Sequence, residues 1–512
     1  MNRIFASAFA AAIVLTCAPV VAPTAQAQSV ATGGGLTAAQ RTEIDLVGQR
    51  SVDDHGAPSV DITVLRDGRV VYQRGFGLRN VEDSVPPDAW TRYPIGSNTK
   101  QFTAASILML QDEGKLHVDD PLAKYLPEIP HARRVTLRNL LMHTGGYAEF
   151  TEIGSFDEIG ARPATPAQVV GSVVSRPLGF TPGTKRQYSN TGYILLQMVI
   201  ERLSGMPYAE FVQRHIFTPL GMTASYVRTY DDTKPDVATE YSDFALGPWE
   251  HATHLDYTWF GGAGAIVTNA ADLAKWNAGL DGGKLLSPRS LKEMMTPVKI
   301  DANFPDYGFG IMNTKLPNGH RMISHGGNTF GAATQDARFP DDHLAIIVLA
   351  NSGTYNYDAA VSAIYSTLVP SPKAAKPHRH APKAPAAKPP AMAATAKAWL
   401  ESAIAGHIDM AALRPDFRAR MSPLHRASLR ALRRFGPRTY TFVSSERRAP
   451  STSYLFQIAT PKEKLIYVYA RDDDGSVGGV AVIPSIDFTP PKGTPTNAQP
   501  SPSPSAPATA AP

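Results

Sequence analysis

The chain has 512 residues, of which 43% are hydrophobic and 19% charged, a composition typical of globular domains with some low-complexity sequence. The formal net charge of +5 is small for this length. A solvated helix face accounts for the densest basic stretch, 414–438, so the charge pattern does not favour a nucleic-acid partner.

The first 27 residues have the pattern of a signal peptide. Arg3 gives the positive start, residues 4–22 form an apolar run, and residues 25–27 (Ala-Gln-Ala) suit cleavage. No stop-transfer pattern follows, so we expect no retained transmembrane helix. The only cysteine, Cys17, would be removed with this segment, which excludes disulfide and thiol chemistry from the mature protein. We therefore expect a periplasmic or secreted protein.

The elements that follow alternate between strands and apolar helices. We expect a β-hairpin at 60–77, helices at 102–113 and 193–203, strands at 321–324, 334–339 and 344–350, and a closing helix at 361–368. Strands at both ends of a helical middle predict one α+β domain, with a sheet completed by distant parts of the chain.

Composition divides the rest of the chain. Residues 370–394 are rich in Pro, Ala and Lys and predict an extended linker. Residues 395–487 return to a helix-then-strand pattern, which predicts a small α+β C-terminal domain. Residues 488–512 predict a disordered tail of Pro, Ser, Thr and Ala. The main domain is thus expected at 28–369.

Ser97 and Lys100 form the first candidate catalytic pair, at the front of the helix expected at 102–113. Residues three apart share a helix face, with β-carbons about 5–6 Å apart. Serine needs a base to become a good nucleophile, and lysine can be that base if burial lowers its pKa. A helix N-terminus also stabilises negative charge on a substrate oxygen. The alternative is a serine that only caps the helix.

Tyr188 and Asn190 form a second candidate pair, on a loop before the helix expected at 193–203. A tyrosine can relay a proton to a leaving group, and an asparagine can hold both a lysine and a substrate amide. No other Tyr-x-Asn occurs in the chain. The alternative is a capping loop with Asn190 or Thr191 as the N-cap of the helix.

A third motif, His325-Gly326-Gly327, follows the strand expected at 321–324. Paired glycines let a strand edge approach a substrate closely. His143-Thr144-Gly145 has the same pattern, so this motif alone does not identify the residue.

Taken together and in this order, Ser-x-x-Lys, Tyr-x-Asn and His-x-Gly resemble the penicillin-recognising serine hydrolases. The resemblance is to the branch of class C β-lactamases, D-alanyl-D-alanine carboxypeptidases, D-aminopeptidases and β-lactamase-like esterases. Further similar segments are Leu-Leu-Met-His-Thr-Gly-Gly at 140–146, Phe-Thr-Pro-Gly at 180–183 and Pro-Leu-Gly-Met at 219–222. The resemblance spans about 36–369, and it selects His325 over His143 because His143 precedes Tyr188.

This resemblance implies an antiparallel sheet flanked by helices, with a mainly helical subdomain. It also implies an acyl-enzyme on Ser97, with no metal or other cofactor. By this resemblance, Lys100 and Tyr188 exchange protons, and Asn190 holds Lys100 and the substrate. The N–H groups of Ser97 and Asn328 would form an oxyanion hole. The residues expected to bind the substrate are His325, Gly326, Gly327 and Asn328.

One departure from the family pattern bears on the substrate. His325 stands where typical β-lactamases have lysine, and a histidine is mostly neutral near pH 7. We therefore expect a D-amino-acid peptidase, carboxypeptidase- or aminopeptidase-like, or an esterase, with weak or no β-lactamase activity. The alternatives are an efficient class C-like β-lactamase and a penicillin-binding sensor or cell-wall-binding protein without turnover. The substrate is expected to be a peptidoglycan-like peptide, an ester or a β-lactam.

Two other enzyme classes are disfavoured. The chain lacks the Gly-x-Ser-x-Gly of α/β-hydrolases. His251 and His254 lack the glutamate of a His-Glu-x-x-His zinc motif. The C-terminal domain is expected either to lie beside the cleft and influence substrate access or to bind the cell wall or a partner independently. Specificity is expected to depend on the loops 147–161 and 230–259.

Overall fold

The structure is a computed structural model that describes residues 35–153, 156–229, 234–298, 306–369, 392–448, 451–486 and 488. The predicted signal peptide, all but the last three residues of the predicted linker, and the predicted tail after its first residue lie outside the described residues. None of the helices in the described ranges is long and apolar enough to span a membrane.

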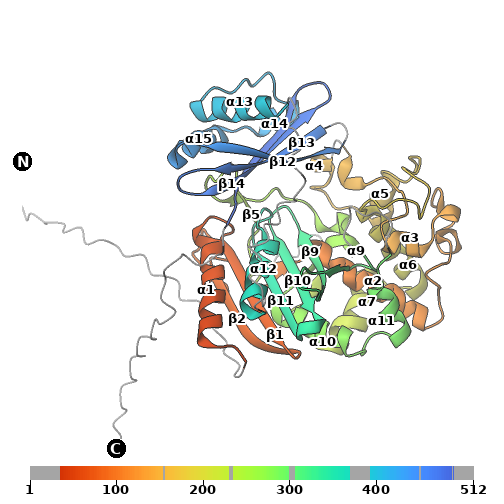
Figure 1. The fold of residues 1–512 in the computed structure, drawn as a ribbon. Helices are drawn as coiled ribbons and strands as arrows, with labels where there is room; N and C mark the ends of the chain where they lie inside the picture. Colours follow the sequence, from red (N-terminus) through yellow and green to blue (C-terminus); the bar gives the residue numbers. More distant parts are fainter. Residues whose placement is uncertain are drawn as a thin grey trace, which may run out of the picture.

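A six-stranded antiparallel sheet, ordered β2-β1-β11-β10-β9-β8, organises the main domain (Figure 1). Its strands are β1 (Ser59–Arg66), β2 (Arg69–Gly77), β8 (Met312–Lys315), β9 (Arg321–Asn328), β10 (Ala333–Phe339) and β11 (Leu344–Ala350). The predicted hairpin forms β1 and β2, and β1 pairs with β11 in a register that sets Ile62 opposite Val348. Both ends of the main domain therefore meet in the middle of one sheet, as the strand pattern predicted.

Helices cover both faces of this sheet. On one face, α1 (Ala38–Asp53) and α12 (Tyr357–Leu368) bury apolar side chains such as Ile44 and Ile364 against the strands. On the other face, α2 (Thr99–Asp112) and α10 (Ala270–Asp281) belong to a larger core, in which the rings of Phe102 and Trp276 stack at 4.1 Å. Helix α2, which begins two residues after Ser97, is thus held inside a close-packed interior, which limits its movement.

The rest of the main domain is a mainly helical region on the right of Figure 1, together with short strands, of which β5 is labelled below the C-terminal domain. Its helices are α3 (Leu137–Leu141), α4 (Phe156–Ile159), α5 (Pro166–Gly171), α6 (Asn190–Ser204), α7 (Tyr208–Val212), α8 (Thr218–Leu220), α9 (Gly261–Gly264) and α11 (Pro288–Met295). The short strands are β3 (Tyr93–Pro94), β4 (Tyr226–Val227) and β7 (Ile266–Thr268) in one sheet, and β5 (Tyr241–Ser242) and β6 (Glu250–His251) in another.

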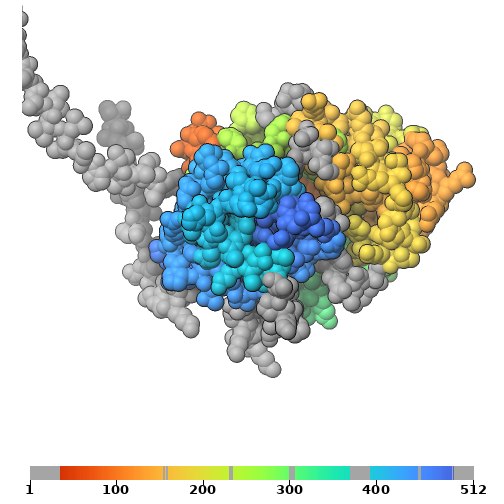
Figure 2. Space-filling view, turned by 90° about the horizontal axis from the view of Figure 1, so that it is seen from above, coloured from red at the N-terminus to blue at the C-terminus, as the bar shows by residue number. Residues whose placement is uncertain are grey.

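Three helices and a four-stranded antiparallel sheet form the C-terminal domain. They are α13 (Met392–Ala405), α14 (Pro415–Arg420), α15 (Pro423–Ala431), β12 (Thr439–Arg448), β13 (Ser451–Ala459), β14 (Lys464–Asp472) and β15 (Val477–Pro484). Buried residues such as Leu429 and Tyr467 give this domain a core of its own. It lies over one end of the main domain, where its blue surface is seen from above in Figure 2.

The structure corrects three expected boundaries. The closing helix α12 begins at Tyr357, four residues before the expected start. Helix α13 begins at Met392, inside the predicted linker. Phe488, assigned to the disordered tail, is only 8% exposed and packs in the core shared by α1 and α12. A terminal apolar residue anchored in a distant core leaves no periodic pattern in the sequence, so composition alone assigned it to the tail.

Candidate active site

Ser97 lies in a short 3-10 turn, Gly96–Asn98, that runs directly into α2. It was expected at the front of the helix, and the structure places it two residues before the first residue of α2. Gly96 has a φ of +49°, and a Cβ added there would lie 2.8 Å from the carbonyl oxygen of Asn328. A glycine is therefore needed for the turn to approach β9 this closely.

Lys100 is fully buried and holds Ser97 directly. Its Nζ lies 2.9 Å from the Ser97 Oγ, 2.8 Å from the Oδ1 of Asn190 and 2.8 Å from the carbonyl oxygen of Ala263. Burial lowers the pKa of Lys100 to about 7, and the negative charge of Glu149 opposes this shift.

These three contacts fit a neutral amine. The oxygens of Asn190 and Ala263 are carbonyl oxygens and can only accept hydrogen bonds. A neutral amine donates its two N–H groups to them, and its lone pair is then left for the hydroxyl proton of Ser97. The geometry is therefore suited to removing a proton from the Ser97 hydroxyl.

Asn190 is positioned by Glu149, a residue that the sequence motifs did not single out. The Glu149 carboxylate accepts hydrogen bonds from the Asn190 N–H at 2.6 Å and from its Nδ2 at 3.1 Å. Only 7% of Glu149 is exposed, and burial raises the pKa of this carboxyl group while the bonds from Asn190 oppose the rise. Helix α6 begins at Asn190 and is capped by the Ser189 hydroxyl, so the alternative that made Asn190 or Thr191 the N-cap is wrong.

We expect Glu149→Gln to lower kcat/KM about tenfold, because an amide cannot accept both bonds from Asn190. Losing this negative charge removes an influence that raises the pKa of Lys100. The rate is expected to rise with pH as Lys100 loses its proton, and in this variant the rise should occur at lower pH. Stopped-flow or steady-state rates across pH 5–9 can measure the change. The exposed Glu152→Gln is the control, and a rise at unchanged pH in Glu149→Gln would contradict the assignment.

Tyr188 is on the loop before α6, and its ring packs against the Lys100 amine. The Lys100 Nζ lies 4.8 Å from the centre of its ring, and its hydroxyl interacts with the Ser97 side chain. Although 41% of Tyr188 is exposed, burial around the hydroxyl raises its pKa above the usual value. The phenol is thus neutral and can donate a proton near Ser97.

His143 also belongs to the site, although the order of the motifs selected only His325. Its ring packs 4.2 Å from the ring of Tyr188, and its Nδ1 accepts a hydrogen bond from the Ser189 N–H at 3.1 Å. Burial lowers the pKa of His143 well below its usual value, and the charge of Lys100 adds to this effect. His143 therefore supports the Tyr188 loop as an uncharged ring.

His325 lies inside β9 and not after it, because the strand continues through Gly326 and Gly327 to Asn328. Its Nδ1 is 2.6 Å from the carbonyl oxygen of Gly326, which can only accept, so Nδ1 carries the hydrogen. Its Nε2 then accepts from the Tyr307 hydroxyl at 3.0 Å. Burial and the charge of Lys100 lower the pKa of His325 to about 3, so this ring is neutral.

The end of β9 has an unpaired edge within the described residues. β10 pairs with β9 as far as Asn328, whereas β8 pairs with β9 only from Arg321 to Ser324. A Cβ added at Gly327 would lie 1.9 Å from the carbonyl oxygen of Ile95, so the strand runs tightly against the segment before Ser97. The free edge at 325–328 is available to an extended substrate.

Ser97 lies between two cavities. The smaller, about 340 Å³, is lined by Tyr188, Tyr307, His325 and Asn328. The larger, about 800 Å³, is lined by Asn190, Glu240, His251, His254, Tyr257 and Phe330. Both include Ser97 and Asn328, so a substrate bound at the serine can extend into each.

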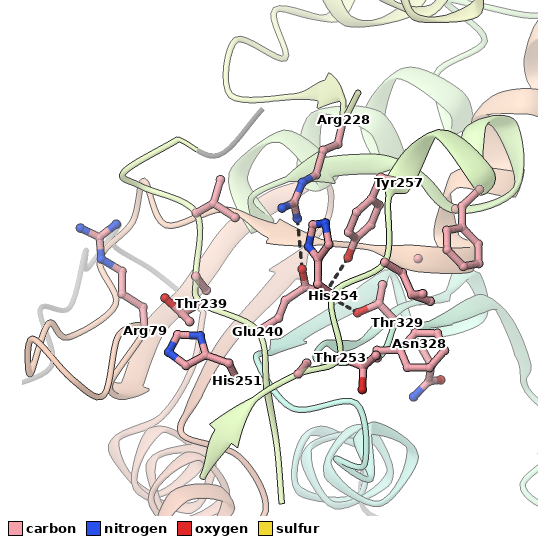
Figure 3. A pocket seen from close by; sticks show the side chains of 18 of the residues that line it. Arg79, Arg228, Thr239, Glu240, His251, Thr253, His254, Tyr257, Asn328 and Thr329 are labelled. Atoms are coloured by element: carbon pink, nitrogen blue, oxygen red, sulfur yellow. Dashed lines mark hydrogen bonds and ion pairs between the residues drawn. The ribbon is translucent and has the colours of Figure 1, made fainter. Parts of the chain in front are cut away.

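Glu240 is the centre of a hydrogen-bond network in the wall of the larger cavity (Figure 3). Its Oε1 accepts from the Tyr257 hydroxyl at 2.6 Å and from the Thr329 hydroxyl at 2.7 Å, and its Oε2 lies 3.1 Å from Arg228. Thr329 directly follows Asn328. The carboxylate therefore ties the cavity wall to the turn after β9.

The fold and the Ser97–Lys100 geometry are those of a serine hydrolase with the β-lactamase and DD-peptidase architecture. The family model described as Beta-lactamase matches residues 44–371, well over half of the chain. The chain belongs to this family.

Individual relatives agree with this assignment. The putative penicillin-binding protein PbpX of Bacillus subtilis is 32% identical over 249 residues, which are 48% of this chain and 60% of PbpX. Penicillin-binding protein 4* of the same organism is 29% identical over 306 residues, 57% of this chain and 67% of the relative. The chain thus spans about three fifths to two thirds of the length of these relatives.

Among solved structures, the D-stereospecific amidohydrolase from Streptomyces superposes with a TM-score of 0.57 and 29% identity. The match covers 65% of this chain and 99% of the amidohydrolase. This agreement confirms the expected α+β fold and the expected serine-hydrolase class.

Proposed function

We propose that the chain is an exported serine hydrolase that forms an acyl-enzyme on Ser97 and cleaves amides or esters of D-amino acids. The observation that carries this proposal is the contact of 2.9 Å between Ser97 and a fully buried Lys100. A lysine whose pKa is lowered to about 7 by burial is a base of suitable strength at neutral pH.

In the proposed acylation, Lys100 takes the proton of Ser97 while the Oγ bonds to the substrate carbonyl carbon. The backbone N–H groups of Ser97 and Asn328 stabilise the resulting oxyanion. The bond to the leaving group then breaks as Tyr188, reprotonated by Lys100, delivers a proton to the departing amine or alcohol. A water molecule attacks the ester carbonyl, and the same groups return the proton to Ser97 as the acid is released.

His325 supports a substrate whose leaving group has no carboxylate. The smaller cavity presents this ring in its neutral form, whereas a lysine would offer an ammonium group to a carboxylate. A D-amino-acid amide or ester meets this condition better than a β-lactam does. The Streptomyces neighbour is a D-stereospecific amidohydrolase, which supports the same substrate class.

Export is part of the proposal and rests on the signal-peptide pattern of residues 1–27. Two relatives that are named penicillin-binding proteins agree with a place outside the cytoplasm. N-terminal sequencing of the protein from a periplasmic or culture-medium fraction tests it, since cleavage after Ala27 would leave Gln28 first.

Activity is tested with four substrates: a D-amino-acid amide, its L-isomer, a p-nitrophenyl acyl ester and a fluorescent penicillin. Repeated turnover of the D-amide or the ester, with slow penicillin hydrolysis, is expected. Fast penicillin hydrolysis would instead identify a class C-like β-lactamase. Stable penicillin labelling without turnover would identify a penicillin-binding sensor, a second candidate that the names of the relatives favour.

We expect His325→Lys to increase the rate of penicillin acylation about tenfold, because it adds an ammonium group for the carboxylate of the drug. Turnover of the D-amide, which has no carboxylate, should not increase. Fluorescent labelling over time measures the first rate, and product release measures the second. The control is His117→Lys, because His117 is exposed and lines neither of the two cavities at Ser97. Equal effects on both substrates would contradict the role given to His325.

A further inference from the structure

Residues 239–255, here called the wall hairpin, connect the larger cavity with the C-terminal domain. β5 and β6 close the hairpin, with Tyr241 opposite His251 and Ser242 opposite Glu250. Its base lines the cavity, where Figure 3 shows Glu240, His251 and His254. Its tip, residues 243–249, points away from the cavity lining toward the C-terminal domain.

The tip is built into the core of the C-terminal domain. Ala245 and Leu246 are each 4% exposed and pack in one cluster with residues of α13, α15 and the four-stranded sheet. Arg434 donates a hydrogen bond to the Leu246 carbonyl oxygen at 3.2 Å. The main domain also touches the tip, since the ring of Trp249 stacks on His55 at 4.3 Å.

His425 of α15 is a second link. Its ring stacks on Phe244 at 4.6 Å, and its Nε2 lies 3.3 Å from a carboxylate oxygen of Glu250. Glu250 is in β6, directly before His251, which lines the cavity. This contact therefore joins the C-terminal domain to the strand that continues into the cavity wall.

The backbone of the tip needs this support. Ala245 has a φ of 53° and Leu246 a φ of 58°, both in the left-handed region that residues with a side chain rarely adopt. Two such residues in succession persist only where surrounding contacts hold them. The C-terminal core buries both side chains and Arg434 bonds the Leu246 carbonyl oxygen, so docking of this domain adds to the local bond between the Leu246 N–H and Asp243.

The base of the hairpin contacts the residues around Asn328, which lines both cavities together with Ser97. The Ala252 N–H bonds the Glu240 carbonyl oxygen at 2.9 Å, and a Cβ added at Gly331 would lie 2.4 Å from the Cβ of Glu240. Glu240 also accepts from Thr329, the residue after Asn328. The hairpin is thus packed against the turn that follows the substrate-binding strand.

We propose that the C-terminal domain acts as a specificity element, fixing the wall hairpin and so deciding which acyl groups the larger cavity accepts. The inference rests on the proposed function for its substrate and on the hairpin contacts for its mechanism. Small acyl groups, which do not reach the wall, are processed without this support, whereas bulky acyl groups require a wall held in place.

The test uses the full mature chain with point variants. Gly247→Val introduces a steric clash between the hairpin tip and α15, because a Cβ at Gly247 would lie 2.2 Å from the Ser428 hydroxyl. Its control is Gly479→Val in β15, where a Cβ meets nothing within 4 Å. His425→Ala removes the second link without adding volume, and His407→Ala in the same domain is its control.

Two readouts decide the outcome. The first is the ratio of kcat/KM for a bulky N-acyl-D-amino-acid ester to that for p-nitrophenyl acetate. We expect Gly247→Val and His425→Ala to lower this ratio at least fivefold, with acetate turnover changed less than twofold. The second is hydrogen exchange of 239–255, which should become faster in both variants and stay unchanged in both controls.

An unchanged ratio with faster exchange confined to 243–249 would overturn the proposal, because the tip would then move without affecting the wall. Unchanged exchange in His425→Ala and Gly247→Val would overturn it as well, since the domain would not be holding the tip. If the wild type shows no Ser97-dependent turnover of either ester, the proposed function fails. The exchange measurement alone then decides whether the domain holds the hairpin.

Discussion

Ser97→Ala is expected to lower kcat/KM by about 10⁴-fold or more, as removal of a nucleophile does in other serine hydrolases. It should also abolish the covalent adduct with a slowly hydrolysed acyl donor. The reason is that the hydroxyl group 2.9 Å from the Lys100 amine is the atom acylated in the proposed mechanism. Steady-state rates and intact-protein mass spectrometry measure the two effects.

Ser106→Ala is the matched control for this variant. Ser106 lies in the same helix, α2, is fully buried, and bonds only the carbonyl oxygen of Phe102 at 2.8 Å within the described contacts. It should keep both activity and adduct. A Ser97→Ala protein that still forms the adduct would place the nucleophile elsewhere.

Lys100→Met is expected to lower kcat/KM by about 10³-fold, within the usual contribution of a general base. Methionine has a similar length and no proton to exchange, so the packed site should stay folded. Circular dichroism and thermal unfolding check the fold. Lys275→Met, whose amine bonds Asp272 and a backbone carbonyl at the surface of α10, is the control.

The wild-type pH profile gives an independent check on Lys100. Because burial lowers the pKa of Lys100 to about 7, the amine is protonated below this pH and cannot accept the Ser97 proton. The value of kcat/KM should therefore rise with pH through about 7 and then level off. His325, whose pKa is lowered to about 3 by burial, adds no step between pH 5 and 9. A profile that falls as the pH rises through 7 would contradict a neutral lysine base.

The sequence predicted the parts of the site that lie close together along the chain. Ser97 and Lys100 are neighbours on a helical turn, so spacing alone shows that they can meet. Tyr188 and Asn190 are likewise two residues apart on one loop. Local backbone geometry decides the contact between Ser97 and Lys100, and the resemblance to a known family supplied the order of the motifs and the choice of His325.

Glu149 could not be found in this way. It reaches Asn190 across 41 residues and carries no motif of its own. Tyr307, which bonds the His325 ring, also lies outside every motif and meets its partner only in the folded structure. A contact between distant segments depends on the tertiary packing, which no periodicity records. An acidic residue in the loop expected to control specificity, 147–161, was the only signal available.

The contact between the wall hairpin and the C-terminal domain could not be predicted from the sequence either. Ala245 and Leu246 form a short apolar pair in a loop, and such pairs occur on many protein surfaces. Only the position of the C-terminal core shows that they are buried. The sequence left two roles open for this domain, and the contacts of the hairpin favour the one beside the cleft.

The pairing of β1 with β11 has a consequence for how the protein folds during synthesis. Val60 and its partner Ala350 are almost 300 residues apart, and β1 is an interior strand that lies between β2 and β11. Until β11 has left the ribosome, the hairpin of β1 and β2 has no neighbour on its inner side, and contacts this distant in sequence form slowly. The sheet of the main domain can therefore be completed only after β11 has been synthesised, when about two thirds of the chain has left the ribosome.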